Sequence, residues 1–382
     1  MEQPDLLKKA SEQKISLSLG TALLLLLVVP LLLLLWQLRS LILLLLISVV
    51  LASSIAPVVD WAERYRIPRW LAVVLIYISL LATAVGVGLL AGPTVFEQIQ
   101  RLVRQVPISL KNIYDVVENW AINFNDSRPE LATDLLNQIL DIQGLTRWAI
   151  RSSQQLLIRS YGVTTGILGG VLSLILSLFL SGYMVADSKT LVNNLARLLP
   201  QPWDERLAAQ VMPVSNRIGS YIRGRLLVSF ILSIAITVSL SALGLGDFAL
   251  GLGAIAGVTN LIPFLGPILG AIPALVVAIP QGGVTFLWVV LLYVIIQNLE
   301  TYILDPLLVG SSVGVHPLYQ LLAVLGGTQV LGIIGALIVP PWIAGGAVLL
   351  ENLYLRPKLM AERRQRLRSP TEPTETIATP VP

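Results

Sequence analysis

The 382-residue chain contains no cysteine and only one histidine, His316. Without cysteine the chain cannot form a disulfide, a thiol nucleophile or a thiolate metal site. A single histidine removes most zinc sites and most histidine-based acid–base catalysis. Phosphate-loop, metal-ligand and nucleophile-elbow patterns are also missing. We therefore expect no enzyme activity, no cofactor and no bound metal.

Charged residues are scarce as well. They make up 13% of the chain, whereas hydrophobic residues make up 55%, and the mean hydropathy is +0.79. Several windows exceed the roughly 18 apolar residues that mark a membrane-spanning helix. The basic residues behind the net charge of +4 lie beside these runs, which is the positive-inside pattern and no indication of nucleic-acid binding. The sequence predicts an all-α, multi-pass membrane protein whose first partner is the lipid bilayer.

The charge pattern predicts both termini on the cytoplasmic side. The polar residues 1–14 precede three spans within 15–93, and the first apolar run is too long for a signal peptide. A transmembrane core is expected over 159–352, with a cytoplasmic loop at 187–225 and a basic, then Pro/Thr-rich, cytoplasmic tail at 353–382. About eight segments result: 16–35, 40–57, 70–92, 161–186, 226–246, 248–281, 284–304 and 317–352.

Residues 94–158 differ from their surroundings because charges return there. Apolar residues recur every three or four positions, as Ile99, Val103 and Val106 show, which predicts amphipathic helices outside the membrane. The segment has no basic excess, so the external side is expected. It is either a helical cap packed on the membrane domain or on another copy, or a gating or docking domain.

More than thirty residues between Asp247 and Gln281 carry no charge, although Asn260, Pro263, Gly266 and Pro267 interrupt them. One unbroken helix of that length would reach roughly 50 Å, against about 30 Å of hydrocarbon. Backbone groups freed by prolines are tolerated only under protein or beside a polar cavity, so the break points to a transport site. A kinked structural helix is the alternative.

The last apolar stretch, 317–352, is interrupted too, at Gly326, Gly327, Gln329, Gly332 and two prolines. Gln329 either joins helices or lines a cavity. Hydropathy allows two arrangements of 248–281 and 317–352. They are either kinked spans of an eight-span chain or two re-entrant hairpins around the span 284–304.

Gln297, Glu300 and Thr301 are spaced to lie on one helix face near the end of an apolar span. A carboxylate in hydrocarbon is costly, so it faces a cavity, pairs with a cation, or binds protons or ions. Because burial favours the protonated form, Glu300 allows proton coupling. Asp305 is a second carboxylate nearer the loop. Alternatively, the span ends earlier and Glu300 lies among the headgroups. His316 is read as an interfacial residue, with a proton relay as its alternative.

Three stretches carry a family resemblance: NRIGSYIRGRLLVS, NLIPFLGPILGAIP, and IIQNLETYILDPLLVGSSVGVHPLYQLLAVLGGTQVLGIIGALIVPP. They cover much of 216–341, and in this order they resemble the autoinducer-2 exporter (AI-2E) family of bacterial membrane proteins. The N-terminal half resembles the family only in span layout and in the helical insert. The family's polar motif would fall on Asn260, Pro263, Gly266, Pro267, Gln297, Glu300, Pro306, His316 and Pro317.

The resemblance implies a secondary transporter of the bacterial plasma membrane, with a homo-oligomer allowed. Its members include exporters of a small furanone-type signal and Na⁺(Li⁺)/H⁺ antiporters. The first hypothesis is therefore export of a small hydrophilic molecule with ion or proton coupling; the second is antiport with Glu300 as the exchanging carboxylate. The third is a non-transporting scaffold. The expected substrate or ion pathway comprises Asn260, Pro263, Gly266, Pro267, Gln297, Glu300, Thr301, Asp305 and Gln329.

Overall fold

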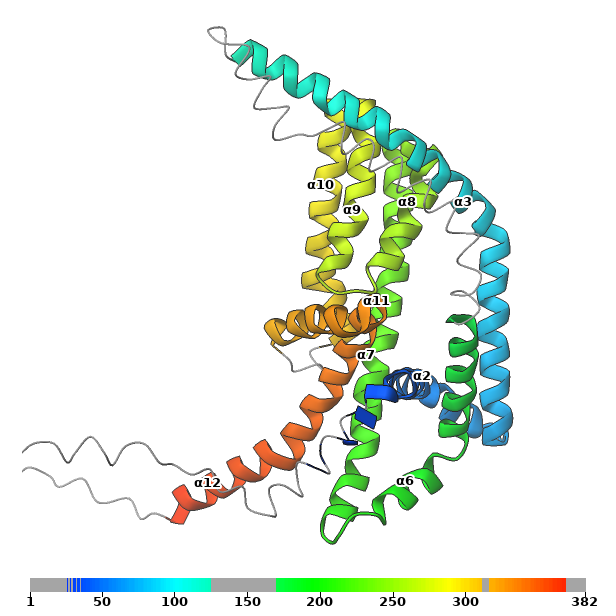
Figure 1. Cartoon of the computed structure of the whole chain (residues 1–382), viewed down its shortest axis with the longest axis vertical. Helices are drawn as coiled ribbons and strands as arrows, with labels where there is room; N and C mark the ends of the chain where they lie inside the picture. Colours follow the sequence, from blue (N-terminus) through cyan, green and yellow to red (C-terminus); the bar gives the residue numbers. More distant parts are fainter. Residues whose placement is uncertain are drawn as a thin grey trace, which may run out of the picture. The chain divides into compact units, whose positions relative to one another are not determined.

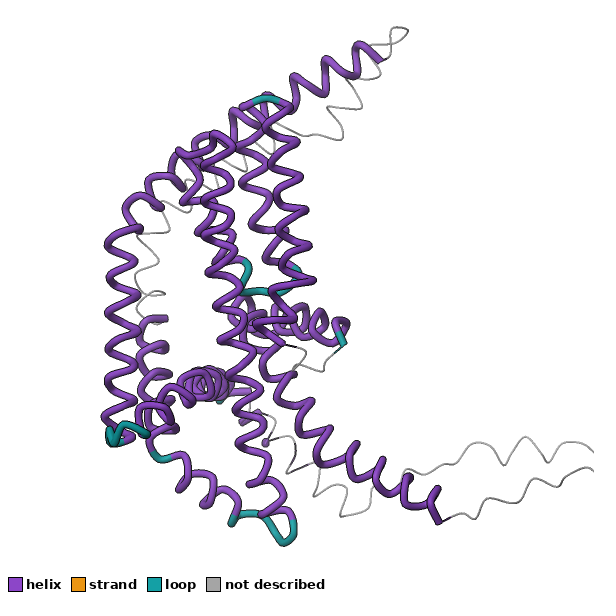
Figure 2. The backbone as a smooth tube through the Cα atoms, turned by 180° about the vertical axis from the view of Figure 1, so that it is seen from behind, coloured by secondary structure: helices purple, strands orange, loops and turns teal. Residues whose placement is uncertain are grey.

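The computed structural model describes residues 26, 28, 30, 31, 33, 34, 36–124, 170–310 and 316–368. All regular structure in these ranges is helical (Figure 2), which confirms the all-α prediction. Most of the expected first span, the second half of the insert, the start of the fourth span and the end of the tail lie outside the described residues. The chain divides into two compact units, Met1–Leu46 and Ile47–Pro382, and the helices that build the site belong to the second.

Five helices in the described ranges are long and apolar enough to cross a membrane, which confirms the polytopic prediction. They are Arg39–Glu63, Arg69–Val106, Trp203–Thr259, Gly283–Val309 and Pro317–Gln365, of which the third is interrupted at Gly244 and the fifth at Gly332. A sixth span results if Gly170–Ala186 and Ser188–Ala196, which bend by 81° relative to each other, count together.

Helix α3 (Arg69–Phe124) runs unbroken past Gly92 and Pro93 (Figure 1). The span expected at 70–92 is therefore part of a longer helix, and the point where that helix leaves the membrane stays a prediction. A proline removes one backbone hydrogen bond and bends a helix, but the helix continues where its neighbours support it. The first half of the insert thus extends the third span, and Leu102 and Val106 of α3 pack against the core of the later helices.

Helix α2 (Arg39–Glu63) is held to α7 (Trp203–Leu240) at a proline. Pro57 has no N–H, so the carbonyl of Ser53 lacks its helical donor. Nη1 of Arg223 in α7 donates instead to the carbonyl oxygens of Ser53 (3.2 Å) and Ser54 (2.9 Å). Gly219 allows the close approach, because a Cβ there would lie 2.1 Å from the Ser53 oxygen.

The segment expected as a cytoplasmic loop, 187–225, is mostly helical. It contains α6 (Ser188–Ala196) and the first half of α7. Its side of the membrane stays a prediction. The second half of α7 enters the apolar core, where Val228, Leu232 and Ile236 are buried.

The chain reverses after α7. Gly244, in η1 (Ser241–Leu245), has a φ of 84°, a conformation that favours glycine. Helix α8 (Gly246–Thr259) then returns along α7, because Gly253 lies against Thr237 and Gly257 against Ser233. Small residues let helix backbones approach closely in lipid.

Helices α8 and α9 (Leu265–Ala278) form a hairpin rather than one kinked span. Ala256 faces Gly270 and Thr259 faces Gly266, which is antiparallel pairing around a turn at 260–264. Each helix has 14 residues and spans about 21 Å, less than the roughly 30 Å of the hydrocarbon layer. The structure therefore favours the re-entrant alternative for 248–281.

Helix α10 (Gly283–Leu299) follows η2 (Ile279–Gln281) and runs back beside α9 (Figure 1). The Tyr293 hydroxyl donates to the carbonyl of Gly270 (3.1 Å). Gln98 of α3 accepts a hydrogen bond from the backbone N–H of Gly251 at 2.6 Å. Helix α3 thus lies against α8 and α9, away from the turn at 260–264.

Helix α11 (Pro317–Leu350) is broken at Gly332, whose φ is 67°, and the break brings Gly327 against Gly335. Its C-terminal half packs on α7, where Ala344 and Tyr221 share a buried cluster. The chain continues through η5 (Glu351–Leu355) into α12 (Arg356–Arg368).

Candidate functional site

A buried charge cluster lies where α7, the hairpin turn and the end of α10 meet. Nη1 of Arg225 donates to Oε1 of Glu300 at 3.0 Å and to Oδ1 of Asp305 at 3.3 Å, and Nη2 donates to Oδ1 of Asn260 at 3.3 Å. The side chains of Arg225 and Glu300 are 5% and 4% exposed, and that of Asp305 is 40% exposed. One guanidinium therefore serves two carboxylates and an amide.

A change of helix type aligns the two carboxylates. The π-helix η3 (Glu300–Gly310) starts at Glu300, directly after α10. Residues five apart point to different sides of an α-helix, whereas the wider π-turn brings them to nearly the same side. Glu300 and Asp305 can thus both reach Arg225. π-Turns are rare and occur often at functional sites.

Glycines set the distances around the cluster. A Cβ on Gly224, next to Arg225, would lie 2.3 Å from the carbonyl oxygen of Leu308 in η3. A Cβ on Gly266 would lie 2.2 Å from the carbonyl oxygen of Thr259 across the hairpin. Only glycine permits these contacts, which bring η3 onto α7 and close the hairpin turn beside Asn260.

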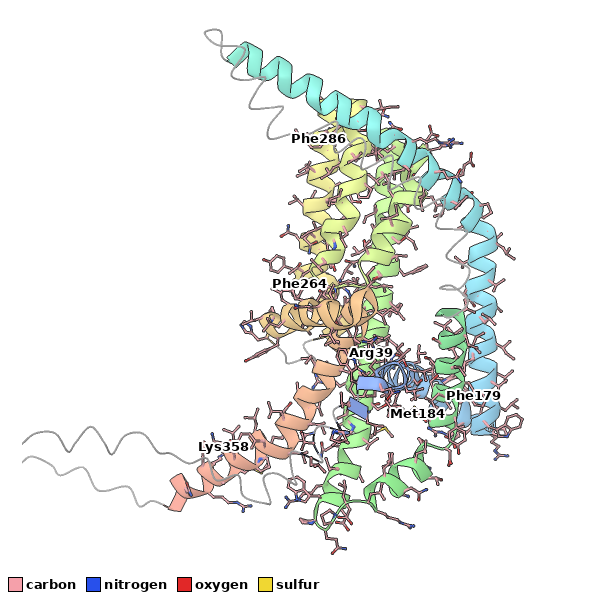
Figure 3. All side chains as sticks on the ribbon, viewed as in Figure 1. Arg39, Phe179, Met184, Phe264, Phe286 and Lys358 are labelled. Carbon is pink, nitrogen blue, oxygen red and sulfur yellow. The ribbon has the colours of Figure 1, made fainter. Side chains whose placement is uncertain are left out.

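The hairpin turn itself is strained. Phe264, which marks it in Figure 3, has a φ of 64°, a region that bulky residues rarely adopt. Pro263 beside it is buried. Such outliers persist where the surrounding structure holds them, and they gather at functional sites.

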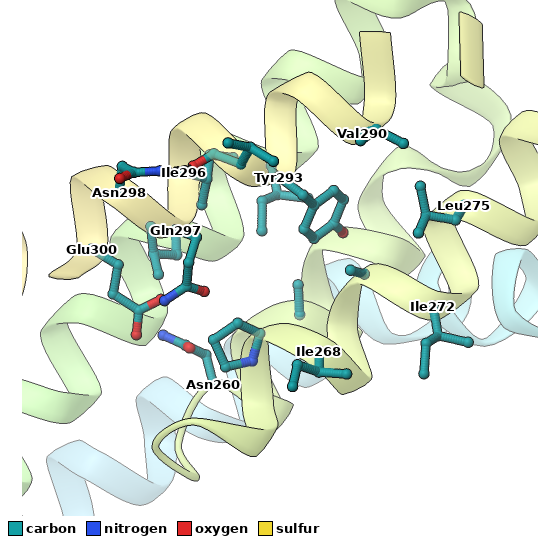
Figure 4. Close-up of a pocket in the computed structure, with 16 residues that line it drawn as sticks. Asn260, Ile268, Ile272, Leu275, Val290, Tyr293, Ile296, Gln297, Asn298 and Glu300 are labelled. Carbon is teal, nitrogen blue, oxygen red and sulfur yellow. Dashed lines mark hydrogen bonds between the residues drawn. The ribbon is translucent and has the colours of Figure 1, made fainter. Parts of the chain in front are cut away.

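A cavity of about 420 Å³ lies between α7, α9 and α10. Most of its lining is apolar, from residues such as Leu232, Ile268 and Ile272. Its polar groups include Asn260, Gln297 and Glu300, which gather at one end in Figure 4. The charge cluster therefore forms one wall of a cavity of ligand size.

Four buried polar atoms around the cluster have no hydrogen-bond partner in the protein. They are the Tyr221 hydroxyl, Nε of Arg225, Oγ of Ser229 and Nδ2 of Asn260. Buried polar groups are nearly always paired with protein or with ordered water. Their hydrogen-bonding capacity is therefore not used by other protein groups.

The structure brings together some of the expected pathway residues. Asn260, Glu300 and Asp305 join the cluster, and Pro267 and Gln297 line the cavity. Pro263 and Gly266 shape the hairpin turn. What these residues bind stays a prediction.

Thr301 and Gln329 lie outside the cluster. Thr301 is exposed and accepts a hydrogen bond from Gln297 (3.2 Å), whereas its neighbour Glu300 is buried. Gln297 therefore contacts Thr301 and also lines the cavity with Glu300, while only Glu300 of the three reaches Arg225. Gln329 is exposed on α11.

The remaining motif residues have local roles. His316 caps the N-terminus of α11, and its Nδ1 accepts a hydrogen bond from the N–H of Leu318 at 3.2 Å. Pro317 follows at the first helical position, which proline favours. Pro306 is exposed within η3.

Sequence reasoning missed Arg225, which was counted among the basic residues of the loop 187–225. The residue is 75 positions from Glu300 in sequence, so no local spacing links the two. One signal was present: Arg225 directly precedes the apolar run of span five, and a buried Glu300 needs a cationic partner.

No group of three or more His, Asp or Glu residues in the described ranges is arranged to hold a metal ion. The site consists instead of the Arg225–Glu300 ion pair, the Asp305 carboxylate and the Asn260 amide. Together with the apolar helices, it defines a multi-pass α-helical membrane protein with a charged site inside its helix bundle.

The chain belongs to the AI-2E transporter family, whose sequence model matches residues 24–362. It is 30% identical to YrrI of Bacillus subtilis, named as a candidate transport protein, over 77% of this chain and 81% of that protein. YueF of the same organism is 27% identical over 84% of this chain and 85% of its own length. A sodium-lithium/proton antiporter of Halobacillus andaensis is 22% identical over 77% of this chain and 84% of that protein. The protein is thus a membrane transporter of this family.

Proposed function

We propose that the protein is a secondary transporter that exports a small hydrophilic molecule of the autoinducer-2 kind, with ions or protons bound at Glu300 and Asp305. The observation that carries the proposal is the Arg225–Glu300 pair at the turn of a hairpin too short to cross the membrane. Interrupted helices of this kind hold the binding sites of secondary transporters.

The charges support a functional rather than a stabilising cluster. A buried ion pair is weak support for stability, because desolvation offsets the attraction between the charges. Ionisable residues at membrane depth are rare and mark ion or substrate pathways. Glu300 and Asp305 compete for one guanidinium, so a proton or a cation that neutralises one carboxylate leaves the other paired with Arg225.

The unpaired atoms favour an oxygen-rich ligand. Nε of Arg225 and Nδ2 of Asn260 can only donate hydrogen bonds, and the hydroxyls of Tyr221 and Ser229 can donate as well. Hydroxyl or carbonyl oxygens of a small polar molecule would accept these bonds. The adjacent cavity of about 420 Å³ is within the range of small-molecule sites.

The location completes the proposal. The basic segments 187–225 and 353–382, together with the lysines of the polar segment 1–14, favour a bacterial plasma membrane orientation with both termini in the cytoplasm. Family membership is compatible with a homo-oligomer. The insert after the third span would then lie outside.

Flux in proteoliposomes tests the proposal. Purified protein should move a small polyhydroxylated furanone, and Glu300→Gln should reduce coupled flux more than it reduces binding, because it keeps the shape but removes the charge. Asp305→Asn should do less, since that side chain is 40% exposed. Glu351→Gln is the matched control, because it makes the same change at an exposed carboxylate outside the cluster. Unchanged flux and pH profile in Glu300→Gln would remove Glu300 from the coupling site.

Sodium or lithium/proton antiport is the second candidate. It is favoured by the excess of negative charge, since two carboxylates share one arginine, and by the similarity to the Halobacillus antiporter. In this case Na⁺ or Li⁺ alone should release protons from the vesicles, and no organic substrate should be needed. A protein that moves neither would be a membrane scaffold.

A further inference from the structure

Polar side chains recur at every fourth position along α7. Arg217, Tyr221, Arg225 and Ser229 are spaced at i, i+4, i+8 and i+12, and over 12 residues the helix rises about 18 Å. In each of the four, a buried polar atom has no hydrogen-bond partner: Nη1 of Arg217, the Tyr221 hydroxyl, Nε of Arg225 and Oγ of Ser229. Most such atoms in the described ranges lie in this row or on Asn260.

The row lies on the protein-facing side of α7. Tyr221, Arg225 and Ser229 are 3%, 4% and 5% exposed. Tyr221 packs beside Ala344 of α11 and Val309 of η3. Phe230 and Leu226, on neighbouring positions of α7, are 65% and 52% exposed and thus present the apolar side of the same helix.

The cluster divides the row. Tyr221 lies one turn before Arg225 on α7. Ser229 lies one turn after Arg225, deeper in the apolar core, beside Gly257 of α8. The cavity with Asn260 and Glu300 in its wall also reaches Leu232 and Ile236, which follow Ser229 on α7.

Isolated buried groups without partners are costly, and water that makes several hydrogen bonds is the usual remedy. Four in a row at one-turn spacing supply the partners for a connected file of water or for a polar molecule that replaces it. Nothing about packing alone requires polar residues at this period, because Ile218, Val228 and Leu232 fill the same buried side with apolar groups.

We infer that the row from Arg217 to Ser229 is a hydrated access route that leads from the N-terminal end of α7 to the cavity, and that Arg225 paired with Glu300 closes it midway. The inference rests on the proposed transport function and names the path and gate of that site. The N-terminal half of α7 belongs to the segment expected in the cytoplasm, so the route opens to that side.

Single cysteines test the route directly, because the chain has none of its own. Tyr221→Cys and Ser229→Cys would be reacted with a membrane-impermeant cationic methanethiosulfonate, added to one side of proteoliposomes at a time. Phe230→Cys and Leu226→Cys are the matched controls. Because the reacting thiolate forms only in contact with water, Tyr221→Cys should react at least about tenfold faster than Phe230→Cys. This should happen from the side of the α7 N-terminus only.

The gate has its own measurement. Glu300→Gln weakens the closure, so it should raise the reaction rate of Ser229→Cys severalfold from that side while leaving Tyr221→Cys unchanged. Arg217→Cys replaces Tyr221→Cys if the tyrosine variant does not fold. Equal rates for Tyr221→Cys and Phe230→Cys would overturn the route. Access only from the opposite side would overturn it too.

The labelling experiment tests the hydrated route, and the flux experiment tests the proposed transport function, so the two can be refuted independently. The reagent reports water at each position whether or not the protein transports anything. The expected labelling without flux of any solute would contradict the proposed function but support the hydrated route. Normal flux with unreactive cysteines along α7 would support the transport function and show that the route lies elsewhere.

Discussion

The Arg225–Glu300 pair yields a quantitative prediction. In Arg225→Gln the Glu300 carboxylate stays in a place where its side chain is 4% exposed and loses its cation. Removing one partner of a buried pair costs about 3–5 kcal/mol, because the remaining charge is uncompensated. Glu300→Gln leaves Arg225 bonded to the half-exposed Asp305 at 3.3 Å, so it should cost less, about 1–3 kcal/mol.

The double variant separates charge from packing. With both charges replaced, only the partly exposed Asp305 carboxylate is left without a cation, so the loss of unfolding free energy should be smaller than the sum of the two single losses. We expect a coupling of about 1–3 kcal/mol, the range for residues in direct contact. The free energy of unfolding would be measured by denaturant titration in detergent micelles, followed by tryptophan fluorescence.

A surface pair provides the control. Nη2 of Arg356 lies 2.9 Å from Oε1 of Glu351, but these side chains are 61% and 44% exposed. The same cycle there should give a coupling below about 1 kcal/mol, because water screens exposed charges. If the Arg225 and Glu300 losses simply add, or if their coupling equals that of the surface pair, the reasoning that the cluster is a tightly coupled buried unit is refuted.

Three further predictions concern other parts of the molecule. Arg223→Gln should lower the free energy of unfolding by about 1–3 kcal/mol in the wild-type background. In the Pro57→Ala background it should lower it clearly less, because alanine at this position restores an N–H for the Ser53 carbonyl. Equal losses in denaturant titrations of the two backgrounds would contradict this. Gly224→Ala should lower folded yield and flux because its Cβ meets the Leu308 carbonyl, whereas Gly326→Ala, with nothing within 4 Å, should be silent in both assays. In intact cells an impermeant thiol reagent should label Ser127→Cys and not Ser369→Cys; the reverse pattern would invert the topology.

Local features of the sequence predicted the all-α, multi-pass class and some of its breaks. The boundary expected between 246 and 248 falls within a few residues of the reversal at Gly244, because glycines and a change in hydropathy mark it. The break around Pro263 is a true turn, and the chain reverses there. At Pro93 the helix continues, since a proline marks a bend but does not decide whether a helix ends.

The pairing of Arg225 with residues far away in the sequence could not be predicted from the sequence. Asn260 and Glu300 stood out because each is polar inside an apolar run, which one chain reveals by itself. Arg225 did not, because it sits at the edge of a basic segment and looks like its neighbours. Its role depends on α7 passing the hairpin turn, and on a π-helix that turns Asp305 toward it. Neither packing nor helix type can be read from spacing.

The way Arg225 is shared suggests why a buried cluster suits a moving part. A single carboxylate partner would make separation cost several kcal/mol, since it would leave two uncompensated charges. With Glu300, Asp305 and Asn260 all bonded to one guanidinium, the hairpin turn or η3 can withdraw one group while the others stay. Each step then costs about one hydrogen bond to a charged group, roughly 1.5–3 kcal/mol. Differences of that size keep a second conformation populated at the level a bound ion or substrate can shift. The cluster can therefore hold the path closed and still release it.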